Sequence, residues 1–219
     1  MAIQDFGPSF SADKLYRARE RAREMTHELS SLIRPGMTEE DAHRLYKELC
    51  VRYGAEKQWH PPKLRFGPNT RCNFKDVSVP YVLKDEDLFF IDIGPVFEGH
   101  EADYGETFVV GAQFEHKHIA DKSRKIFEEV GAQWLAHRTP GPALYEYAKA
   151  RAEHYGLVLN MGSDGHRIGD FPHHVHFKGA LVECEEGIVP DAWILEIHLF
   201  DPGRRFGAFF EDLLTEKKF

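Results

Sequence analysis

The stretch that most constrains the fold is Leu88–Gly111, where two runs of strand-forming residues flank the turn Glu98-Gly99-His100. Aromatic and β-branched residues favour strands and glycine favours a turn, so this stretch predicts a β-hairpin. Asp92 lies inside an apolar run, where a carboxylate without a partner costs several kcal/mol. Asp103 stands in the returning strand, and pairing about a centre near 97–98 would put both carboxylates on one face. Two negative charges that close repel unless a proton or a cation lies between them, and we expect a cation.

The order of helices and turns around this hairpin occurs twice along the chain. Apolar residues at spacings of three and four predict two helices before the hairpin, capped by Ser11 and Thr38, and two after it, over 115–137 and from Pro142. Each pair is divided by a Pro-Gly turn and ends at a Tyr-Gly step. Residues 55–86 carry four prolines, which predicts loops and short strands there.

A second hairpin is predicted from strands over 192–199 and 206–215, joined by the turn Asp201-Pro202-Gly203-Arg204. It also carries two carboxylates among apolar neighbours, Glu196 and Glu211, which lie symmetrically about that turn and so share a face. We therefore interpret the chain as an internal duplication in which each half brings an acidic pair to a shared centre. The expected halves of this single domain, 1–219, are about 11–111 and 115–215.

Composition excludes several classes of protein. Lys and Arg number 28 against 36 Asp and Glu, a net charge of −8, so we expect neither a nucleic-acid nor a membrane partner. With 219 residues and 42% hydrophobic content the chain can bury a sizeable core. The cysteines, Cys50, Cys72 and Cys184, form no CxxC pair, and the start has no signal-peptide pattern, so we expect a cytoplasmic protein.

Four carboxylates gathered at one place need positive charge, which one or two divalent metal ions would supply. The candidate nitrogen ligand is His166, because flanking glycines in the segment 162–169 let the backbone approach closely. One imidazole and four carboxylates suit Mn, Fe, Co or Zn better than Ca. Two such ions would generate a hydroxide near neutral pH and stabilise the tetrahedral intermediate of a hydrolysis. Hydrogen-bonded structural acids are the alternative.

Together these motifs resemble the pita-bread metallopeptidases, the superfamily of methionine aminopeptidase, Xaa-Pro aminopeptidase, prolidase and creatinase. The resemblance rests on the order of the four acids and His166, with Thr107–Gly111 and Gly165–Gly169 beside them, and it extends over nearly the whole chain. It implies an α+β pita-bread fold, in which two pseudo-symmetric helix-helix-hairpin halves form a curved, mostly antiparallel sheet with helices on its outer face. It implies two metal ions held by five ligands, which are Asp92, Asp103, His166, Glu196 and Glu211.

The resemblance also assigns a role to each position. Asp103 and Glu211 would bridge the two ions, and Asp92 would bind one of them through both oxygens. His166 and Glu196 would complete the site of the other ion. Glu196 or a nearby acid would carry a proton to the leaving nitrogen, which would make Glu196 catalytic.

A second catalytic candidate is His173, seven residues after His166. It matches a histidine that contacts the substrate and the tetrahedral intermediate in the family. His174 and His176 stand close to it, so a solvated histidine face is the alternative for this cluster.

Two positions depart from the family pattern and bear on the substrate. The family's peptidases usually keep a histidine about eighteen residues before the first aspartate, where this chain has Phe74. His60 is the candidate to replace it as a substrate-binding residue, with a packed loop as the alternative. Where the family commonly has proline after the glutamate, His198 follows Glu196 by two residues and shares its strand face, so it is a further substrate-binding candidate, with a structural role equally open.

Three hypotheses of function follow. The first is a dinuclear metal-dependent hydrolase, an aminopeptidase or Xaa-Pro peptidase that acts on short peptides. The second, motivated by Phe74, is a non-peptidase metalloenzyme on the same scaffold, acting on a small amide, a guanidino compound or a natural-product intermediate. The third is a binding module, against which the intact ligands argue. The resemblance does not include the N-terminal domain of prolidases and creatinase, so recognition surfaces are missing or come from a second subunit, and a homodimer is one expectation.

Overall fold

One antiparallel sheet runs through both halves of the chain in the computed structural model, which describes residues 4–173 and 179–217. Within these residues the sheet has eight strands in the order β1-β2-β4-β8-β7-β5, with β3 beside β2 and β6 beside β7. The strands are β1 (Lys57–Phe66), β2 (Asp87–Phe97), β3 (His100–Glu101), β4 (Tyr104–Val110), β5 (Val158–Leu159), β6 (His166–Arg167), β7 (Trp193–Phe200) and β8 (Gly207–Leu213). The sheet is open, because β1 and β5 do not pair with each other.

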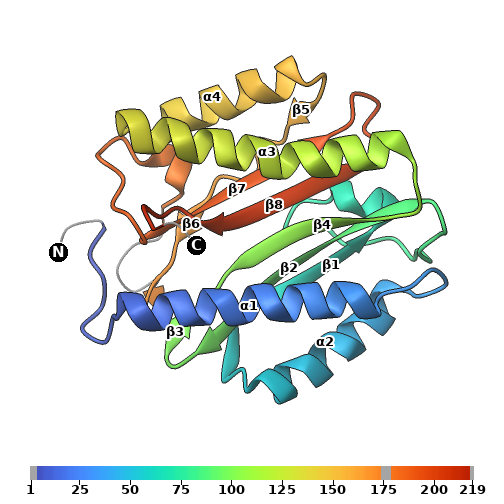
Figure 1. The fold of residues 1–219 in the computed structure, drawn as a ribbon, viewed down its shortest axis with the longest axis horizontal. Coiled ribbons are helices and arrows are strands. Elements are labelled where there is room, and N and C mark those ends of the chain that lie inside the picture. Colours follow the sequence, from blue (N-terminus) through green and yellow to red (C-terminus); the bar gives the residue numbers. More distant parts are fainter. Residues whose placement is uncertain (1–3, 174–178, 218–219) are drawn as a thin grey trace.

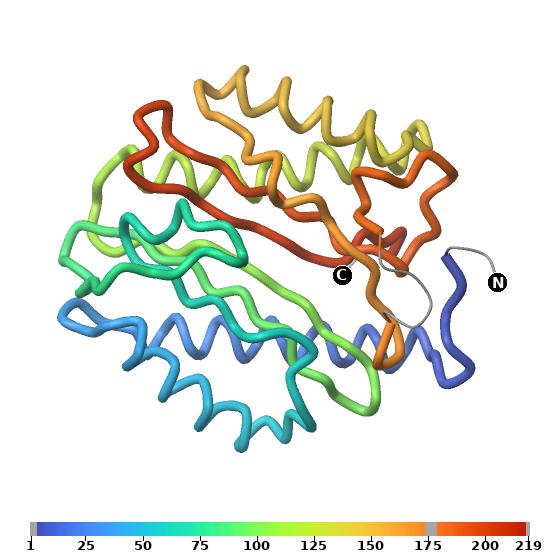
Figure 2. Tube along the Cα trace, turned by 180° about the vertical axis from the view of Figure 1, so that it is seen from behind, coloured from blue at the N-terminus to red at the C-terminus, as the bar shows by residue number. Residues whose placement is uncertain are grey.

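Four helices in the described part of the chain cover one face of this sheet, as Figure 1 shows from the helix side and Figure 2 from behind. They are α1 (Ala12–Leu32), α2 (Glu39–Tyr53), α3 (Phe114–His137) and α4 (Gly141–His154), with short 3-10 turns η1 (Gly67–Arg71) and η3 (Leu181–Glu183). α1 packs on β2 and β4, and α3 packs on β7 and β8. Each half thus brings two helices and a hairpin to a common sheet, which confirms the predicted α+β pita-bread architecture.

The helix boundaries follow the signals in the sequence. Thr38 and Asp41 cap α2 reciprocally, each side chain accepting a hydrogen bond from the backbone N–H of the other residue. Ser11 immediately precedes α1, but its side chain makes no capping hydrogen bond. None of the helices described is long and apolar enough to cross a membrane.

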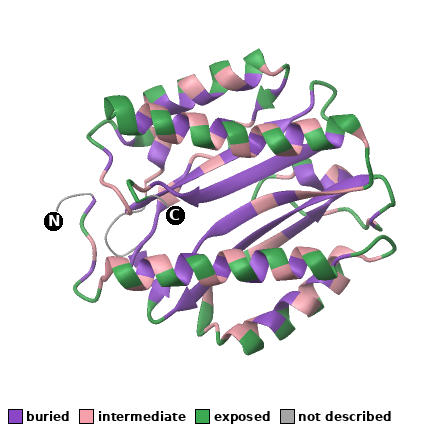
Figure 3. Ribbon diagram, in the orientation of Figure 1, coloured by how far each residue is buried: buried purple, intermediate pink, exposed green. Residues whose placement is uncertain are grey.

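The central strands place alternate residues on opposite faces of the sheet. In β2, Phe89, Ile91 and Ile93 belong to the core that forms with α1 and α2. Phe90 and Asp92 point to the other side. Figure 3 shows β7 buried along most of its length, and β2 and β8 are buried at every residue. Residues on both faces of β2 and β8 are therefore buried, and a polar side chain among them needs a partner.

The two hairpins have different registers. In the second, Glu196 pairs directly with Glu211, as predicted. In the first, Asp92 pairs with Gly105, because the turn centres one residue later than expected. The predicted direct opposition of Asp92 and Asp103 is therefore wrong: the two carboxylates are diagonal neighbours on the same face.

The segment 55–86 also differs from expectation, because β1 runs for 10 residues through Pro61-Pro62. It is an edge strand, where a proline needs no ladder partner on its outer side. Its pairing with β2 shifts between Gln58 and His60 and again between His60 and Lys63. The strand therefore bulges at the histidine, and such bulges redirect side chains.

Candidate metal centre

Three acidic side chains and one glycine form a row across the four central strands. Asp92 of β2 pairs with Gly105 of β4, which in turn pairs with Glu211 of β8. Glu211 then pairs with Glu196 of β7. Residues that pair directly point to the same side, so the row shares one face of the sheet. A Cβ atom at Gly105 would lie 2.7 Å from Glu211 Oε1, so glycine keeps the middle of the row open.

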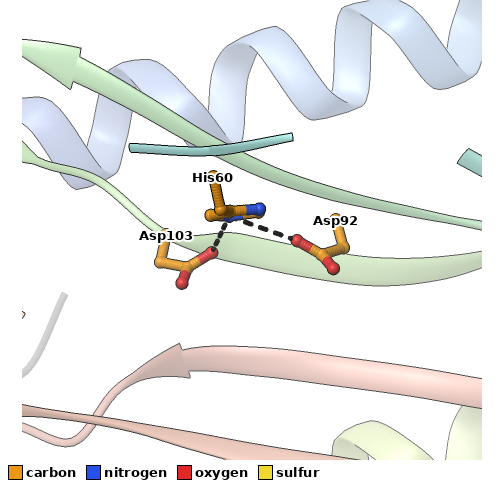
Figure 4. A group of neighbouring side chains, drawn as sticks. All are labelled: His60, Asp92 and Asp103. Atoms are coloured by element: carbon orange, nitrogen blue, oxygen red, sulfur yellow. Dashed lines mark hydrogen bonds and ion pairs between the residues drawn. The ribbon is translucent and has the colours of Figure 1, made fainter. Parts of the chain in front are cut away.

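Two histidines reach this row from the flanking strands. His60 of β1 places Nε2 3.5 Å from Asp92 Oδ1 and 3.4 Å from Asp103 Oδ1, as drawn in Figure 4. His166 of β6 places Nε2 2.9 Å from Asp103 Oδ2. In each histidine, Nδ1 lies next to the carbonyl oxygen of the following residue, at 3.0 Å for His60 and 2.8 Å for His166. Asp103 therefore has one imidazole near each of its carboxylate oxygens.

These buried groups shift one another's pKa values. Burial raises the pKa of Asp92 to about 7, against the attraction of His60. Burial opposes the charged form of His60, but the carboxylates of Asp92 and Asp103 raise its pKa to about 9. Burial likewise opposes the charged form of His166, and the hydrogen bond to Asp103 raises its pKa to about 9. The imidazoles thus hold positive charge that the carboxylates demand.

That positive charge is not enough for all the acids. Burial, with the charges of Asp103 and Asp92, raises the pKa of Glu211 well above its usual value. Burial also raises the pKa of Glu196. Asp103 moves the other way: burial opposes its charge, but the two histidines hold its pKa well below its usual range. Glu211 Oε1 is buried and has no hydrogen-bond partner among the described residues. An orphaned buried oxygen within this set of carboxylates and imidazoles fits a divalent cation.

The donor atoms form two overlapping sets with the spacing of metal ligands. His60, Asp92 and Asp103 form one set, and Asp103, His166 and Glu211 form the other. Within each set the donor atoms lie within 4.8 Å of one another. Because Asp103 belongs to both sets, it stands where a carboxylate shared by two ions would stand.

The centre opens into a cavity of about 540 Å³, a size suited to a small ligand. The five ligands predicted from the sequence all line it, namely Asp92, Asp103, His166, Glu196 and Glu211. His60 also lines it, and its ring centroid lies 5.7 Å from that of Phe74, the residue at the position of the family histidine. Trp59, Lys75 and Asp164 contribute to the wall as well.

His173 lies beside the centre. Its ring centroid is 6.2 Å from that of His166 and 5.2 Å from that of Trp59. Glu101 of β3 orients it: the backbone N–H of His173 donates to Glu101 Oε1 at 3.0 Å, and its Nδ1 contacts Glu101 Oε2. The other two histidines of the predicted cluster, His174 and His176, lie outside the described residues.

His198, in contrast, is held by the protein itself. Its Nε2 lies 2.7 Å from the carbonyl oxygen of Thr70, and its Nδ1 lies 3.0 Å from Asn160 Nδ2. Burial lowers its pKa to about 4, so the ring is neutral at pH 7. Both ring nitrogens already have protein partners, so this geometry favours the structural alternative over substrate contact.

Three features of the centre were not predicted from the sequence. His60 contacts both aspartates. The ring of Trp59 packs against those of the histidines, and Glu101 holds His173 by hydrogen bonds. The glycine at position 94 is the one trace of this arrangement in the sequence, because Gly94 pairs with His60 and a Cβ atom there would lie 2.1 Å from His60 Cδ2. It could not be interpreted from the sequence, because the pairing of β1 with β2 was not predicted.

An open antiparallel sheet with carboxylates and imidazoles converging on its face defines a class, the metal-dependent hydrolases with a carboxylate-rich centre. The sequence profile of metallopeptidase family M24 matches residues 13–215. The chain therefore belongs to metallopeptidase family M24, which confirms the resemblance seen in its motifs. No curated protein matches the chain in sequence.

Solved structures share this fold at low sequence identity. X-Pro aminopeptidase from Thermotoga maritima superposes with a TM-score of 0.73 at 22% identity over 94% of this chain, which spans 61% of that protein. Methionine aminopeptidase from Thermotoga maritima superposes with a TM-score of 0.72 at 16% identity, and the match covers 96% of this chain and 95% of that chain. Zinc-substituted aminopeptidase P from Escherichia coli superposes with a TM-score of 0.77 at 19% identity, and the match covers 98% of this chain and 55% of that chain.

Proposed function

We propose that the chain is a dinuclear metal-dependent aminopeptidase or Xaa-Pro peptidase that acts on short peptides. The observation that carries the proposal is the pair of overlapping donor sets joined at Asp103. Two sets with one shared carboxylate match two ions better than one, and their mixture of oxygen and nitrogen suits Mn, Fe, Co or Zn. The family membership and the aminopeptidases with the same fold support this substrate class.

Each residue of the proposed centre has a role. Asp103 and Glu211 would bridge the ions, Asp92 would bind the first, and His166 and Glu196 would bind the second. When bound, the two ions would supply the Lewis acidity and the activated water that amide hydrolysis requires.

The protein supplies the proton transfer and the positioning. The Glu196 carboxyl, whose pKa burial raises, would pass a proton to the leaving nitrogen. Gly165 N–H donates to Glu196 Oε2 at 2.8 Å and fixes that carboxyl. His173, oriented by Glu101, would contact the substrate oxygen as negative charge develops on it. Trp59, whose ring packs against those of His60, His166 and His173, would exclude water from that side of the centre.

A second candidate function is a non-peptidase hydrolase on the same scaffold, acting on a small amide, a guanidino compound or a natural-product intermediate. Phe74 favours it, because an apolar ring in the cavity wall cannot hydrogen-bond a scissile amide as a histidine does. Phe74 lines the cavity and is 47% exposed, so its ring is accessible to a ligand there.

One experiment separates these functions. Protein purified without added metal is analysed for its elements and then tested on Met-, Ala- and Xaa-Pro-peptides with Mn, Fe, Co or Zn. Cleavage of one peptide class by protein with about two ions per chain supports the first function. Bound metal with silence on every peptide favours the second function. Less than one ion per chain would indicate a binding module instead.

Cys50, Cys72 and Cys184 are all free, which supports a reducing compartment such as the cytoplasm. A homodimer would supply a second wall to the cavity, and light scattering of the metal-loaded protein tests it.

A further inference from the structure

The edge strand β1 carries a histidine whose surroundings repeat those of His166 in the other half. His60 pairs with Gly94, two residues after Asp92 in β2, and His166 pairs with Ile194, two residues before Glu196 in β7. Each hairpin thus receives one imidazole from the strand that flanks it. We infer that His60 is itself a metal ligand, binding through Nε2 the ion held by Asp92 and Asp103, an inference that rests on the proposed function.

The hydrogen bonding of the ring suits a ligand. Nδ1 of His60 lies 3.0 Å from the carbonyl oxygen of Pro61, and Nδ1 of His166 lies 2.8 Å from that of Arg167. A histidine that binds a metal through one nitrogen usually donates the N–H of the other to a carbonyl or carboxylate, which fixes the tautomer. Both histidines therefore present Nε2 to the shared carboxylate of Asp103, His60 at Oδ1 and His166 at Oδ2.

The distances leave room for an ion shared by His60 and the two aspartates. His60 Nε2 lies 3.4 Å and 3.5 Å from the two aspartate oxygens, beyond the usual range of N–H···O hydrogen bonds. Two ligand atoms each about 2.1 Å from one ion at a tetrahedral angle are about 3.4 Å apart. The spacing of His60 from Asp92 and Asp103 therefore fits ligand atoms of one cation.

The protein makes room for the ring at the cost of a side chain. A Cβ atom at Gly94 would lie 2.3 Å from His60 Nε2 and 2.6 Å from Trp59 Nε1, so only glycine admits both rings. Trp59 Nε1 donates to the carbonyl oxygen of Ala102 at 3.0 Å, and its ring meets that of His60 edge-on at 4.4 Å. His60 is only 8% exposed, so the ring is held in place and not free to turn to solvent.

With His60 as a ligand, each of the two ions would have one imidazole. A second nitrogen in the centre favours Zn, Co or Fe over Mn. His60 has two other possible roles, as a charged partner of the aspartates or as a contact to substrate. Neither requires a bond to metal, so a measurement of metal ligands distinguishes them from the inferred role.

Zinc X-ray absorption and calorimetric titration test the assignment. Protein stripped by a chelator is loaded with Zn²⁺ as wild type, His60→Gln, His166→Gln and the control His116→Gln, a buried histidine on the helix side. Wild type should show about one imidazole per zinc ion. His60→Gln and His166→Gln should each show about one imidazole for every two zinc ions. Each of these two variants should bind one zinc more weakly by about 100-fold or more, and His116→Gln should match wild type.

The outcomes separate the inference from the proposed function. Wild type with about one imidazole for every two zinc ions, and none in His166→Gln, would overturn the role of His60 and leave the dinuclear centre standing. Wild type that binds no zinc would overturn both. The imidazole count of wild type needs no variant, so it decides the question even if His60→Gln fails to fold.

Discussion

The two hairpins bring equivalent acids to one centre by different means. In β7–β8, Glu196 and Glu211 stand directly opposite each other. In β2–β4, Asp92 stands opposite Gly105, and its partner acid Asp103 lies two residues before that glycine. The first hairpin therefore contributes one acid to the central row and a second acid beside it, whereas the second contributes both of its acids to the row.

The offset in the first hairpin explains why the centre can hold two sets of donors. Displaced by two residues, Asp103 reaches His60 with one oxygen and His166 with the other. Because Gly105 has no side chain, the row keeps the space that the offset requires. The symmetry between the halves is thus broken at Asp103, the residue common to both donor sets.

The largest effect is expected at Asp103, which takes contacts from both halves. Asp103→Ala should lower hydrolysis by about 100-fold or more and reduce bound metal, because it removes the ligand common to both donor sets. The fold should remain, as circular dichroism would show. The control is Glu98→Gln at the exposed turn of the same hairpin, which should leave activity and metal content unchanged. Full activity of Asp103→Ala without bound metal would refute the shared-ligand role.

The next effect is expected at Gly105, where the two hairpins meet. Gly105→Ala should weaken metal binding by about 10–100-fold, because its methyl group would displace the carboxylate of Glu211. Overpacking should also lower the free energy of unfolding by about 1–3 kcal/mol, measured in urea. The matched control is Gly131→Ala in α3, where a Cβ meets nothing within 4 Å, and which should stabilise the protein by about 0.5–1 kcal/mol. Unchanged metal affinity in Gly105→Ala would show that the row needs no gap.

The same contrast explains what the sequence could and could not predict. The helices and the second hairpin are encoded locally: Thr38 caps α2, and Asp201-Pro202-Gly203 fixes one turn and hence the pairing of Glu196 with Glu211. The first turn has no proline, and Glu98 and Gly99 both have positive φ, so apolar patterning left its register uncertain by one residue.

The place of His60 depends on contacts that are distant in sequence. Pro61-Pro62 argued against a strand, and only the edge position of β1 makes them compatible with one. The bulge that directs the ring toward Asp92 and Asp103 arises from the pairing of β1 with β2, not from a local motif. The acids could be predicted as site residues because their apolar neighbours are visible in the sequence. The contact of His60 with the acids could not, because a histidine beside prolines carries no comparable signal.

A smaller effect is expected at Asp201, which holds the turn of the second hairpin. Its carboxylate accepts hydrogen bonds from the backbone N–H groups of Gly203 and Phe206, each at 3.1 Å, and from Arg205 Nε at 2.9 Å. Asp201→Ala should lower the free energy of unfolding by about 1–3 kcal/mol. Arg17→Ala, which removes the exposed ion pair at the turn of the first hairpin, should leave this free energy nearly unchanged, because water screens that pair.

The pH dependence of the Asp201 effect has a fixed sign. Burial opposes the charge of Asp201, but its hydrogen bonds to Arg205 and Phe206 lower its pKa below the ordinary value. A lowered pKa in the folded state contributes stability that is present above about pH 4 and is lost as pH falls through the folded pKa. The difference between wild type and Asp201→Ala should therefore shrink in acid, and a difference that grows as pH falls would contradict this role.

The smallest effect is expected in the loops that flank the hairpins, where the halves differ in charge. The first half contributes Lys75 to the cavity wall, and the second half contributes Asp164. A short peptide carries a carboxylate that Lys75 can attract, so Lys75→Ala should raise KM by about two- to fivefold at low salt and leave kcat unchanged. The effect should vanish in high salt and for peptides with an amidated C-terminus, whereas Lys149→Ala on the exposed side of α4 should alter neither parameter. An equal rise in KM for amidated peptides would show that Lys75 acts on the shape of the cavity and not through its charge.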